Sequence, residues 1–386
     1  MATKNIFSLP LDAFGRIVGA DGGYNDSRDV KVSQTADGAS LNDIWGEFQE
    51  SVGIRNAERN LIIDLLTFNV TAATEAVTQL SSAKFERAGE YSEPRGTTQK
   101  PATFWLGYGL DWFDIANRYT WRYLADASQE QVEAVHASVL EGDNQNVFAG
   151  VLSAIYDNQN RVADINDQEV NVYALYNADG TVPPNYKTNT FTSTHTHYMV
   201  SGAATVDSGD LDDLVEALSE HGYSSANGVQ LVICLSSKEG KEVRKFRIAS
   251  GDTYDFIPAQ DEPLDLILNP GQSVAGQRPA GTHKGLKVIG KYGSTIVVED
   301  DLFPPGYVMI FGTGGKNNLN NPVGMRQHQN PSMQGLRLVK GPDNDYPLVD
   351  SFYQRGFGTG IRQRGGAAVV QIKASGSYAP PANYVA

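Results

Sequence analysis

The sequence predicts an α+β protein in which helices and sheets are built by different stretches of the chain. Residues 128–157 carry apolar side chains at helical spacing. The continuous apolar run Val229–Leu235 is typical of a strand buried on both faces. From residue 286 onward, short strand patterns follow one another. The chain has 386 residues, and single cores stop growing at roughly 250–300 residues, so two folded units are expected.

The N-terminal stretch predicts an extended arm followed by a short helix. Residues 1 to about 40 hold isolated apolar side chains between turn formers such as Gly22-Gly23, which is too little apolar surface to fold alone. We expect this arm to lie across another element or another subunit. A helix then begins after Ser40 and ends near Gly53. Its apolar face consists of Leu41, Ile44, Trp45 and Phe48. The apolar, partly β-branched residues 61–70 predict a strand.

Residues 82–113 predict a long, polar, two-stranded hairpin. The segment 84–101 carries charges of both signs and is interrupted by Gly and Pro. Strand patterns, Val77–Phe85 and Thr103–Leu110, flank it. Because an isolated hairpin is only marginally stable in water, a neighbouring subunit is its expected support. The alternative is a disordered surface loop.

A long helix is predicted next, with an interruption. Ser128 and Gln131 form a capping-box pattern at its start. Apolar residues continue at helical spacing on both sides of Gly142, which predicts a break there or two consecutive helices.

The middle of the chain predicts mixed α/β structure. Val170–Tyr176 has a strand pattern, and Asp207 or Ser208 is placed to cap a helix that ends near Gly222. After the Val229–Leu235 strand, Glu239-Gly240 predicts a turn.

The last hundred residues predict β structure. Gly293 separates two strand patterns as in a hairpin. A polar loop is expected at 312–335. The strands expected here are Leu286–Tyr292, Thr295–Val298, Tyr307–Phe311 and Ala367–Ile372.

Composition limits the classes of partner. The formal net charge is −14, and an acidic chain repels DNA at long range, whereas dedicated nucleic-acid binders carry a basic face. The single Cys234 excludes an intramolecular disulfide and a multi-cysteine metal site. No run approaches ~18 consecutive apolar residues, and the start lacks a signal-peptide core, so we expect no membrane association and a location in a cytoplasm or in a particle assembled there.

The glycine-rich and acidic motifs do not predict a catalytic or cofactor site. Gly312–Asn317 lacks the first glycine and the Ser/Thr of a phosphate loop. Gly356–Gly360 does not open the helix of a dinucleotide site. Four aspartates complement a helix N-terminus; they are Asp207, Asp210, Asp212 and Asp213. Glu299-Asp300-Asp301 indicates a solvated turn.

The histidines do not predict a metal site. The spacing of His195 and His197 places both on one face of a strand and can suit a metal, but the sequence indicates no third ligand. A structural or exposed role is therefore favoured for this pair. The remaining histidines, at 136, 221, 283 and 328, are scattered along the sequence. We predict no catalytic, cofactor-binding or metal-binding residues.

The C-terminal run resembles the closing segment of phage major capsid proteins. In Phe352–Ile372 an aromatic and arginine-containing stretch leads through Arg362-Gln363-Arg364-Gly365-Gly366-Ala367-Ala368-Val369-Val370 into the last strand. Residues 290–306 resemble the hairpin that precedes this segment in that family. The order of arm, hairpin, long helix, α/β unit and returning strands is also similar. The resemblance implies the Hong Kong 97-like shell fold of tailed bacteriophages.

This resemblance implies a structural role and a division of the chain. The expected protein is a major capsid protein that self-assembles into an icosahedral head around double-stranded DNA, without enzymatic activity or a cofactor. The implied division is an N-terminal arm and short helix (1–55), a peripheral domain with a spine helix (56–81 and 114–164), an extended loop (82–113), an axial domain (165–285), and a return to the peripheral domain with C-terminal strands (286–386).

Partners also follow from the resemblance. Hexamers and pentamers of this chain are expected, together with a portal and a decoration protein. A separate scaffolding protein is also expected, because no coiled-coil segment of about a hundred residues precedes the arm. The family's covalent cross-link needs a lysine, an asparagine and a glutamate. Lys84 or Lys100 and Asn344 could serve as the first two, but only Asp343, Asp345 and Asp350 stand where the glutamate would be. No cross-link is predicted.

Two alternatives remain at this point. An encapsulin-type nanocompartment shares the shell fold and encloses enzymes instead of DNA. A carbohydrate-active enzyme with a β-rich end would need paired carboxylates in a cleft, and the sequence nominates no such pair.

Overall fold

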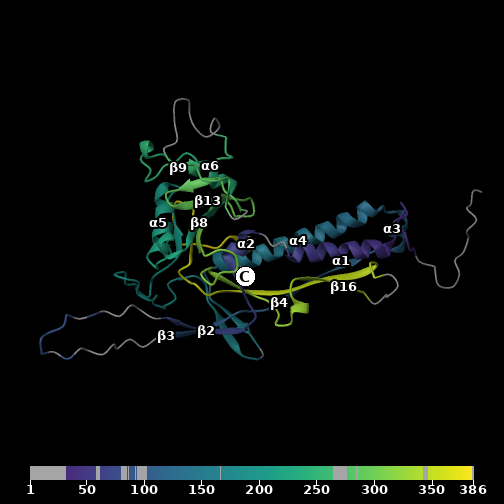
Figure 1. The fold of residues 1–386 in the computed structure, drawn as a ribbon, viewed down its shortest axis with the longest axis horizontal. Coiled ribbons are helices and arrows are strands. Elements are labelled where there is room, and N and C mark those ends of the chain that lie inside the picture. Colours follow the sequence, from purple (N-terminus) through teal and green to yellow (C-terminus); the bar gives the residue numbers. More distant parts are fainter. Residues whose placement is uncertain are drawn as a thin grey trace, which may run out of the picture.

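The structure is a computed structural model, and it describes residues 32–57, 61–79, 85, 87–91, 93, 102–165, 167–263, 276–283, 286–341 and 347–384. Figure 1 shows an elongated molecule, in which a part built of sheet and helices around strand β8 (Gln230–Leu235) adjoins a long extension. We call this extension the helical arm. It consists of helices α1 (Leu41–Ala57) and α4 (Gln129–Tyr156) and strands β4 (Asp111–Arg118) and β16 (Leu336–Lys340). The predicted N-terminal arm lies largely outside the described residues.

Helix α4 runs along the helical arm (Figure 1). The Gln131 side chain accepts a hydrogen bond from the Ser128 backbone N–H (3.1 Å), as the capping pattern predicts. The predicted break at Gly142 is wrong, because the helix runs unbroken for 28 residues. A helical glycine costs about 1 kcal/mol relative to alanine, which is too little to interrupt a helix held by packing on both sides.

Helix α1 packs on α4 and on β16. It begins at Leu41, as predicted, and Leu41, Ile44 and Phe48 are buried. It continues past Gly53 to Ala57, so the predicted end is wrong. The predicted strand over 61–70 is half right. Residues Leu61–Leu66 form helix α2, and only Thr67–Val70 form strand β1. A short run that is apolar at nearly every position has no period that separates helix from strand.

A seven-stranded sheet forms the core of the other part, in the order β7-β18-β14-β8-β13-β12-β9. Strand β8 pairs in parallel with β13 and antiparallel with β14, and five of its residues are buried, as its apolar run predicts. Helix α5 (Ser208–Ser219) packs on β14 and β18. The other strands are β7 (Tyr198–Val200), β9 (Phe256–Pro258), β12 (Gly290–Tyr292), β13 (Thr295–Glu299), β14 (Tyr307–Thr313) and β18 (Ala367–Gln371).

A second sheet, which includes β4 and β16, underlies helices α1 and α4 and is organised by strand β17 (Asp350–Ile361). One edge of β17 pairs with β15 (Val323–Arg326) and, farther out, with β16, while its other edge pairs with β4. Strand β1 extends the sheet by pairing in parallel with β15. The segment 312–335, predicted to be a loop, therefore contains a strand whose partners are distant in sequence.

Besides the short antiparallel pair of β10 (Thr282–His283) and β11 (Leu286–Lys287), two hairpins complete the β structure of the described residues. The first joins β2 (Thr74–Gln79) to β3 (Ala102–Gly107), and it projects from the molecule as Figure 1 shows. The base of the hairpin predicted around 82–113 is thereby confirmed, whereas most of its tip lies outside the described residues. The second joins β5 (Arg161–Asp164) to β6 (Glu169–Val172), so the strand predicted to reach Tyr176 ends earlier.

Short elements connect these layers. Glu239-Gly240, predicted to be a turn, lies in helix α6 (Ser237–Val243), which the Ser236 side chain caps by accepting a hydrogen bond from the Lys238 N–H. The predicted hairpin at Gly293 is confirmed, because Tyr292 pairs with Thr295 around it. The remaining elements are α3 (Trp121–Asp126) and four 3-10 turns at Ser225–Asn227, Ile248–Ser250, Pro331–Met333 and Ala382–Tyr384.

Candidate functional site

Strand β4 lies at an open sheet edge and presents apolar side chains to solvent on both of its faces, Trp112 on one and Phe113 and Ile115 on the other. Among the described strands it pairs with β17 alone, so its other edge lacks a strand partner. Trp112, Phe113 and Ile115 are 45%, 40% and 52% exposed. An exposed, apolar edge strand is a site where another chain can bind.

The same exposure extends along the adjoining hairpin. Trp105 on β3 is 64% exposed, and Phe85 and Tyr91, beyond the end of the paired strands, are almost fully exposed. Strand β3 leads into β4 through only three residues. Between Phe85 and Ile115, the described residues therefore include a series of large apolar side chains that the rest of the described structure leaves exposed. We call these six side chains the apolar strip: Phe85, Tyr91, Trp105, Trp112, Phe113 and Ile115.

A polar network fixes the base of the hairpin. The buried Tyr108 donates its hydroxyl hydrogen to Glu75 (3.0 Å), and Glu75 also accepts from Arg362 Nε (3.0 Å). Arg326 donates to the Tyr108 carbonyl oxygen (2.7 Å). Burial, with the neighbouring Glu75 carboxylate, raises the pKa of Tyr108, so its hydroxyl remains a donor. These bonds tie the hairpin to β15 and to the end of β17 and so fix its direction.

The second arginine of the C-terminal motif holds a loop against the core. Arg364 donates to the carbonyl oxygens of Ala174 (2.9 Å) and Leu175 (3.2 Å) and forms an ion pair with Asp179 (2.8 Å). Its guanidinium also lies over the ring of Tyr176, 4.7 Å from the centroid. Because the guanidinium satisfies these carbonyl groups, the chain after Val172 needs no strand partner, which explains why the predicted strand ends there.

The glycine-rich motifs, from which the sequence predicts no catalytic or cofactor site, serve structural roles. At Gly312–Asn317, the Asn321 side chain accepts from Thr313 Oγ1 and donates to the Gly315 carbonyl oxygen, which fills the turn from within. Lys316 forms an ion pair with Asp64 (2.7 Å). The Gly356–Gly360 run lies inside β17.

The acidic groups also have local partners. Asp207 and Asp210 cap α5 reciprocally through each other's backbone N–H, and burial raises the pKa of Asp210 to about 6. The sequence predicts that Glu299 lies in a solvated turn. The structure instead places it in an ion pair with Arg244 (2.5 Å). Cys234 is fully buried, and its pKa is raised well above the usual value by that burial, so the thiol stays protonated.

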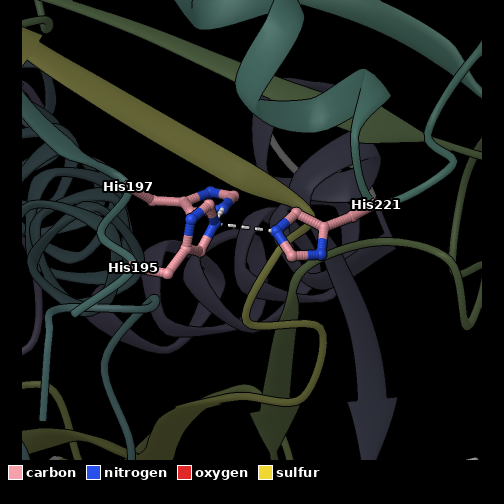
Figure 2. Close-up of side chains that lie close together, drawn as sticks. All are labelled: His195, His197 and His221. Carbon is pink, nitrogen blue, oxygen red and sulfur yellow. Dashed lines mark hydrogen bonds between the residues drawn. The ribbon is translucent and has the colours of Figure 1, made fainter. Parts of the chain in front are cut away.

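Three histidines come together, where the sequence indicated only two. Figure 2 shows the rings of His195 and His197 facing the ring of His221. The Nε2 atom of His195 lies 3.0 Å from that of His221 and 3.1 Å from that of His197. His221 follows helix α5, and the sequence gives no sign of this proximity because 26 residues separate it from His195.

A fourth histidine, also judged scattered in the sequence, is structural. His136 on α4 lies 2.6 Å from the Ser51 hydroxyl and 2.5 Å from the Tyr353 hydroxyl, and its ring stacks on Phe48. It joins α1, α4 and β17 inside the helical arm.

Among the described residues, none of the helices has the length and apolar character needed to cross a membrane. No protein-family model matches the chain, and no curated protein sequence matches it significantly. Solved structures do match. A structure from Mycobacterium phage Patience shares 45% sequence identity, covering 95% of this chain and 98% of that chain with a TM-score of 0.71.

Other solved shells are more distant. The mature capsid of bacteriophage PhiM1 is 9% identical over 83% of this chain and 89% of that chain, with a TM-score of 0.46. An encapsulin complex from Synechococcus elongatus is 10% identical over 86% and 98%, with a TM-score of 0.43. The phage match, at 45% identity over nearly the whole length, decides between the phage and nanocompartment alternatives. The chain belongs to the major capsid proteins of tailed bacteriophages with the Hong Kong 97-like fold, and it is a shell subunit of the phage head.

Proposed function

We propose that the apolar strip on the β2–β3 hairpin and strand β4 is the surface by which this capsid protein holds neighbouring copies in the shell. The observation that carries the proposal is the exposure of six large apolar side chains between Phe85 and Ile115. Burying one such side chain is worth about 1.5–3 kcal/mol, so several of them together supply a substantial contact. A second copy of the chain is the partner that a self-assembling shell provides.

The charge of the chain favours an apolar contact over an ionic one. Each copy carries a formal net charge of −14, so copies repel one another at low ionic strength. Apolar burial is independent of this repulsion, whereas added salt weakens the repulsion within a Debye length of about 10 Å at 0.1 M. Under this proposal assembly becomes easier as the salt concentration rises.

Ile115→Asp tests the proposed surface. The side chain is half exposed, so the substitution leaves the folded subunit intact, but it places a charge in the contact. We expect particle yield, measured by sedimentation and electron microscopy, to fall at least tenfold. Ile115→Val, which stays apolar, is the matched control and should assemble normally. Normal yield from Ile115→Asp, with an unchanged circular dichroism spectrum, would refute the assembly role of β4.

The proposal extends to the division of the chain into domains. The axial domain would comprise 165–285 with the strands β12, β13, β14 and β18, because these strands share one sheet with β8. The peripheral domain would comprise 56–81, 114–164 and the remainder of 286–386, and 82–113 would be the extended loop. Limited proteolysis of the subunit should cut first within 82–113 if this loop is supported only by neighbours.

Further partners follow from membership in the family. Under the proposal the shell is built of hexamers and pentamers in the host cytoplasm, with a separate scaffolding protein, a portal and a decoration protein, and it encloses DNA without reading its sequence. The acidic net charge supports a lining that does not grip DNA. Closed empty shells from this chain expressed alone would count against the need for a scaffolding protein.

The role we propose is purely structural. Among the described residues, the acidic groups that sequence analysis singled out act in a helix cap, in the case of Asp207 and Asp210, or in an ion pair, in the case of Glu299. The one thiol is buried and protonated. These placements support a chain that contributes surfaces rather than a reaction.

A further inference from the structure

The three-histidine cluster joins two segments that are far apart in the fold's connectivity. His195 and His197 lie just before strand β7, at the end of a stretch without regular structure that follows β6. His221 lies just after helix α5. Each residue offers one ring nitrogen, and the three nitrogens all lie within 4.8 Å of one another. His197 is fully buried, whereas His195 and His221 are partly exposed, so the cluster opens toward solvent on one side.

The hydrogen bond of His197 fixes its tautomer, and so determines which ring nitrogen offers a lone pair to the cluster. Its Nδ1 lies 2.7 Å from the Ala367 carbonyl oxygen. A carbonyl oxygen only accepts, so Nδ1 carries the hydrogen, and in the neutral ring Nε2 is left with a lone pair. That Nε2 points toward His195 Nε2. Histidines that bind metals have this arrangement, with the far nitrogen donating to a backbone carbonyl or a carboxylate.

Hydrogen bonding among the rings leaves the cluster incompletely satisfied. His195 Nε2 lies between the Nε2 atoms of His197 and His221, at 3.1 Å and 3.0 Å. One nitrogen holds at most one hydrogen, which can point well at only one of the two neighbours. A single cation among the three nitrogens would be approached by all three lone pairs at once.

Neighbouring groups hold the rings in place. Phe191 stacks on His221 with ring centroids 4.3 Å apart, and Tyr176 stacks on it with centroids 5.5 Å apart. A Cβ atom at Gly365 would lie 2.8 Å from His221 Cγ, so the glycine lets the backbone approach this ring closely. Rings held this way lose little freedom on binding.

The protonation state of the rings suits coordination. Burial lowers the pKa of His221 to about 3 and also lowers the pKa values of His195 and His197. Neutral imidazole is the form that binds a metal. The positive charge of the nearby Arg364 is balanced by its ion pair with Asp179 (2.8 Å).

We propose that His195, His197 and His221 bind one divalent transition-metal cation of the zinc class, with water as the fourth ligand. Nitrogen ligands select such ions over Mg²⁺ and Ca²⁺, which prefer oxygen. Around tetrahedral Zn²⁺, with Zn–N bonds of about 2.0–2.1 Å, donor atoms are about 3.3–3.4 Å apart. The two short separations in the cluster need to widen by only a few tenths of an ångström to match this spacing, and the third, between His197 and His221, lies within 4.8 Å.

The bound ion would act as a cross-brace. It would tie the stretch between β6 and β7 to the end of α5, beside the start of β18, where Ala367 holds His197. Because the ion binds the folded chain and not the unfolded one, it would stabilise the subunit by mass action.

Zn²⁺ titration of the full-length chain, after removal of metals with a chelator, tests the proposal. We expect calorimetry to show one site per chain and the unfolding temperature to rise with Zn²⁺. Co²⁺ as a second probe should develop the visible absorption of a four-coordinate ion. His195→Gln and His221→Gln should each weaken Zn²⁺ binding by more than the roughly 10–100-fold expected from losing an outer-shell partner.

His328→Gln is the matched control, because His328 lies outside the cluster, near Trp112, and should leave binding unchanged. His195 is partly exposed, so its variant keeps the fold even if His221→Gln does not; circular dichroism checks both. The proposal is overturned if the folded parent chain binds no Zn²⁺, or if His195→Gln binds it as tightly as the parent. It stands independently of the assembly surface proposed above.

Discussion

Arg355 on β17 and Asp143 on α4 form a two-pronged ion pair, with Nε 2.5 Å from Oδ1 and Nη2 2.7 Å from Oδ2. Their side chains are only 13% and 7% exposed, so each charge depends on the other for its solvation. Planar, bidentate geometry makes this the strong form of such a contact. The pair fastens the middle of the long helix to the sheet beneath it.

Asp143→Asn should therefore lower the free energy of unfolding by about 3–5 kcal/mol, because it leaves the Arg355 guanidinium buried without its counter-ion. Chemical denaturation of the unassembled subunit measures this. The double variant Asp143→Asn/Arg355→Met should lose less than the single variant. Lys245→Gln is the control, since it breaks the exposed pair with Glu242 and should change stability by less than about 1 kcal/mol. If Asp143→Asn and Lys245→Gln lowered the free energy of unfolding equally, the buried pair would contribute no more to stability than the exposed one.

His136 predicts an acid-sensitive helical arm. Burial lowers its pKa from 6.5 to about 4. Between these values the unfolded chain binds a proton that the folded chain does not, so the free energy of unfolding falls as the pH drops from about 6.5 to about 4. His136→Gln removes this contribution, and its stability curve should be flatter than the parent's over that window. Parallel curves for the two proteins would contradict the assignment.

Two glycines with opposite surroundings predict opposite effects of alanine. At Gly142 on α4 an added Cβ meets nothing within 4 Å, so Gly142→Ala should stabilise the subunit by about 0.5–1 kcal/mol. At Gly358 on β17 an added Cβ would overlap the Gly109 carbonyl oxygen, so Gly358→Ala should destabilise it severely. Thermal unfolding of the two variants beside the parent gives both signs. A stable Gly358→Ala would mean that the β3–β4 connection can move aside.

Charge on the hairpin predicts an effect on assembly alone. The charges between 86 and 95 are mixed in sign, and they suit register with a partner through electrostatic complementarity. Arg87→Glu with Glu90→Arg keeps the net charge and reverses the pattern. We expect fewer particles and an unchanged circular dichroism spectrum of the subunit. A normal particle yield would remove these charges from the assembly surface.

Local signals in the sequence located the elements whose causes are local. The Ser128–Gln131 pattern placed the start of α4, and Asp207 placed the start of α5, because a cap is made within four residues. The apolar run at β8 indicated a strand in the middle of a core. The glycine at 293 supplied the turn between β12 and β13 with a φ of +56°.

The failures have tertiary causes. Helix α4 passes through Gly142 because neighbouring elements hold it, and β15 exists because β1 and β17 pair with it from far along the chain. The proximity of His221 to His195 and His197 likewise depends on how α5 folds back toward β7. Periodicity and spacing carry no information about contacts across such separations.

Strand β17 has a mechanical consequence. It runs along the helical arm and, only six residues after its end at Ile361, the chain enters β18 in the other sheet. Its ladder bonds to β4, β15 and β16 lie across the strand direction. Tension applied lengthwise, as when packed DNA presses a head outward, would strain these bonds in shear and all together. A pull across the strand would instead peel them one after another. The fold thus makes the subunit stiffest along the helical arm, parallel to β17.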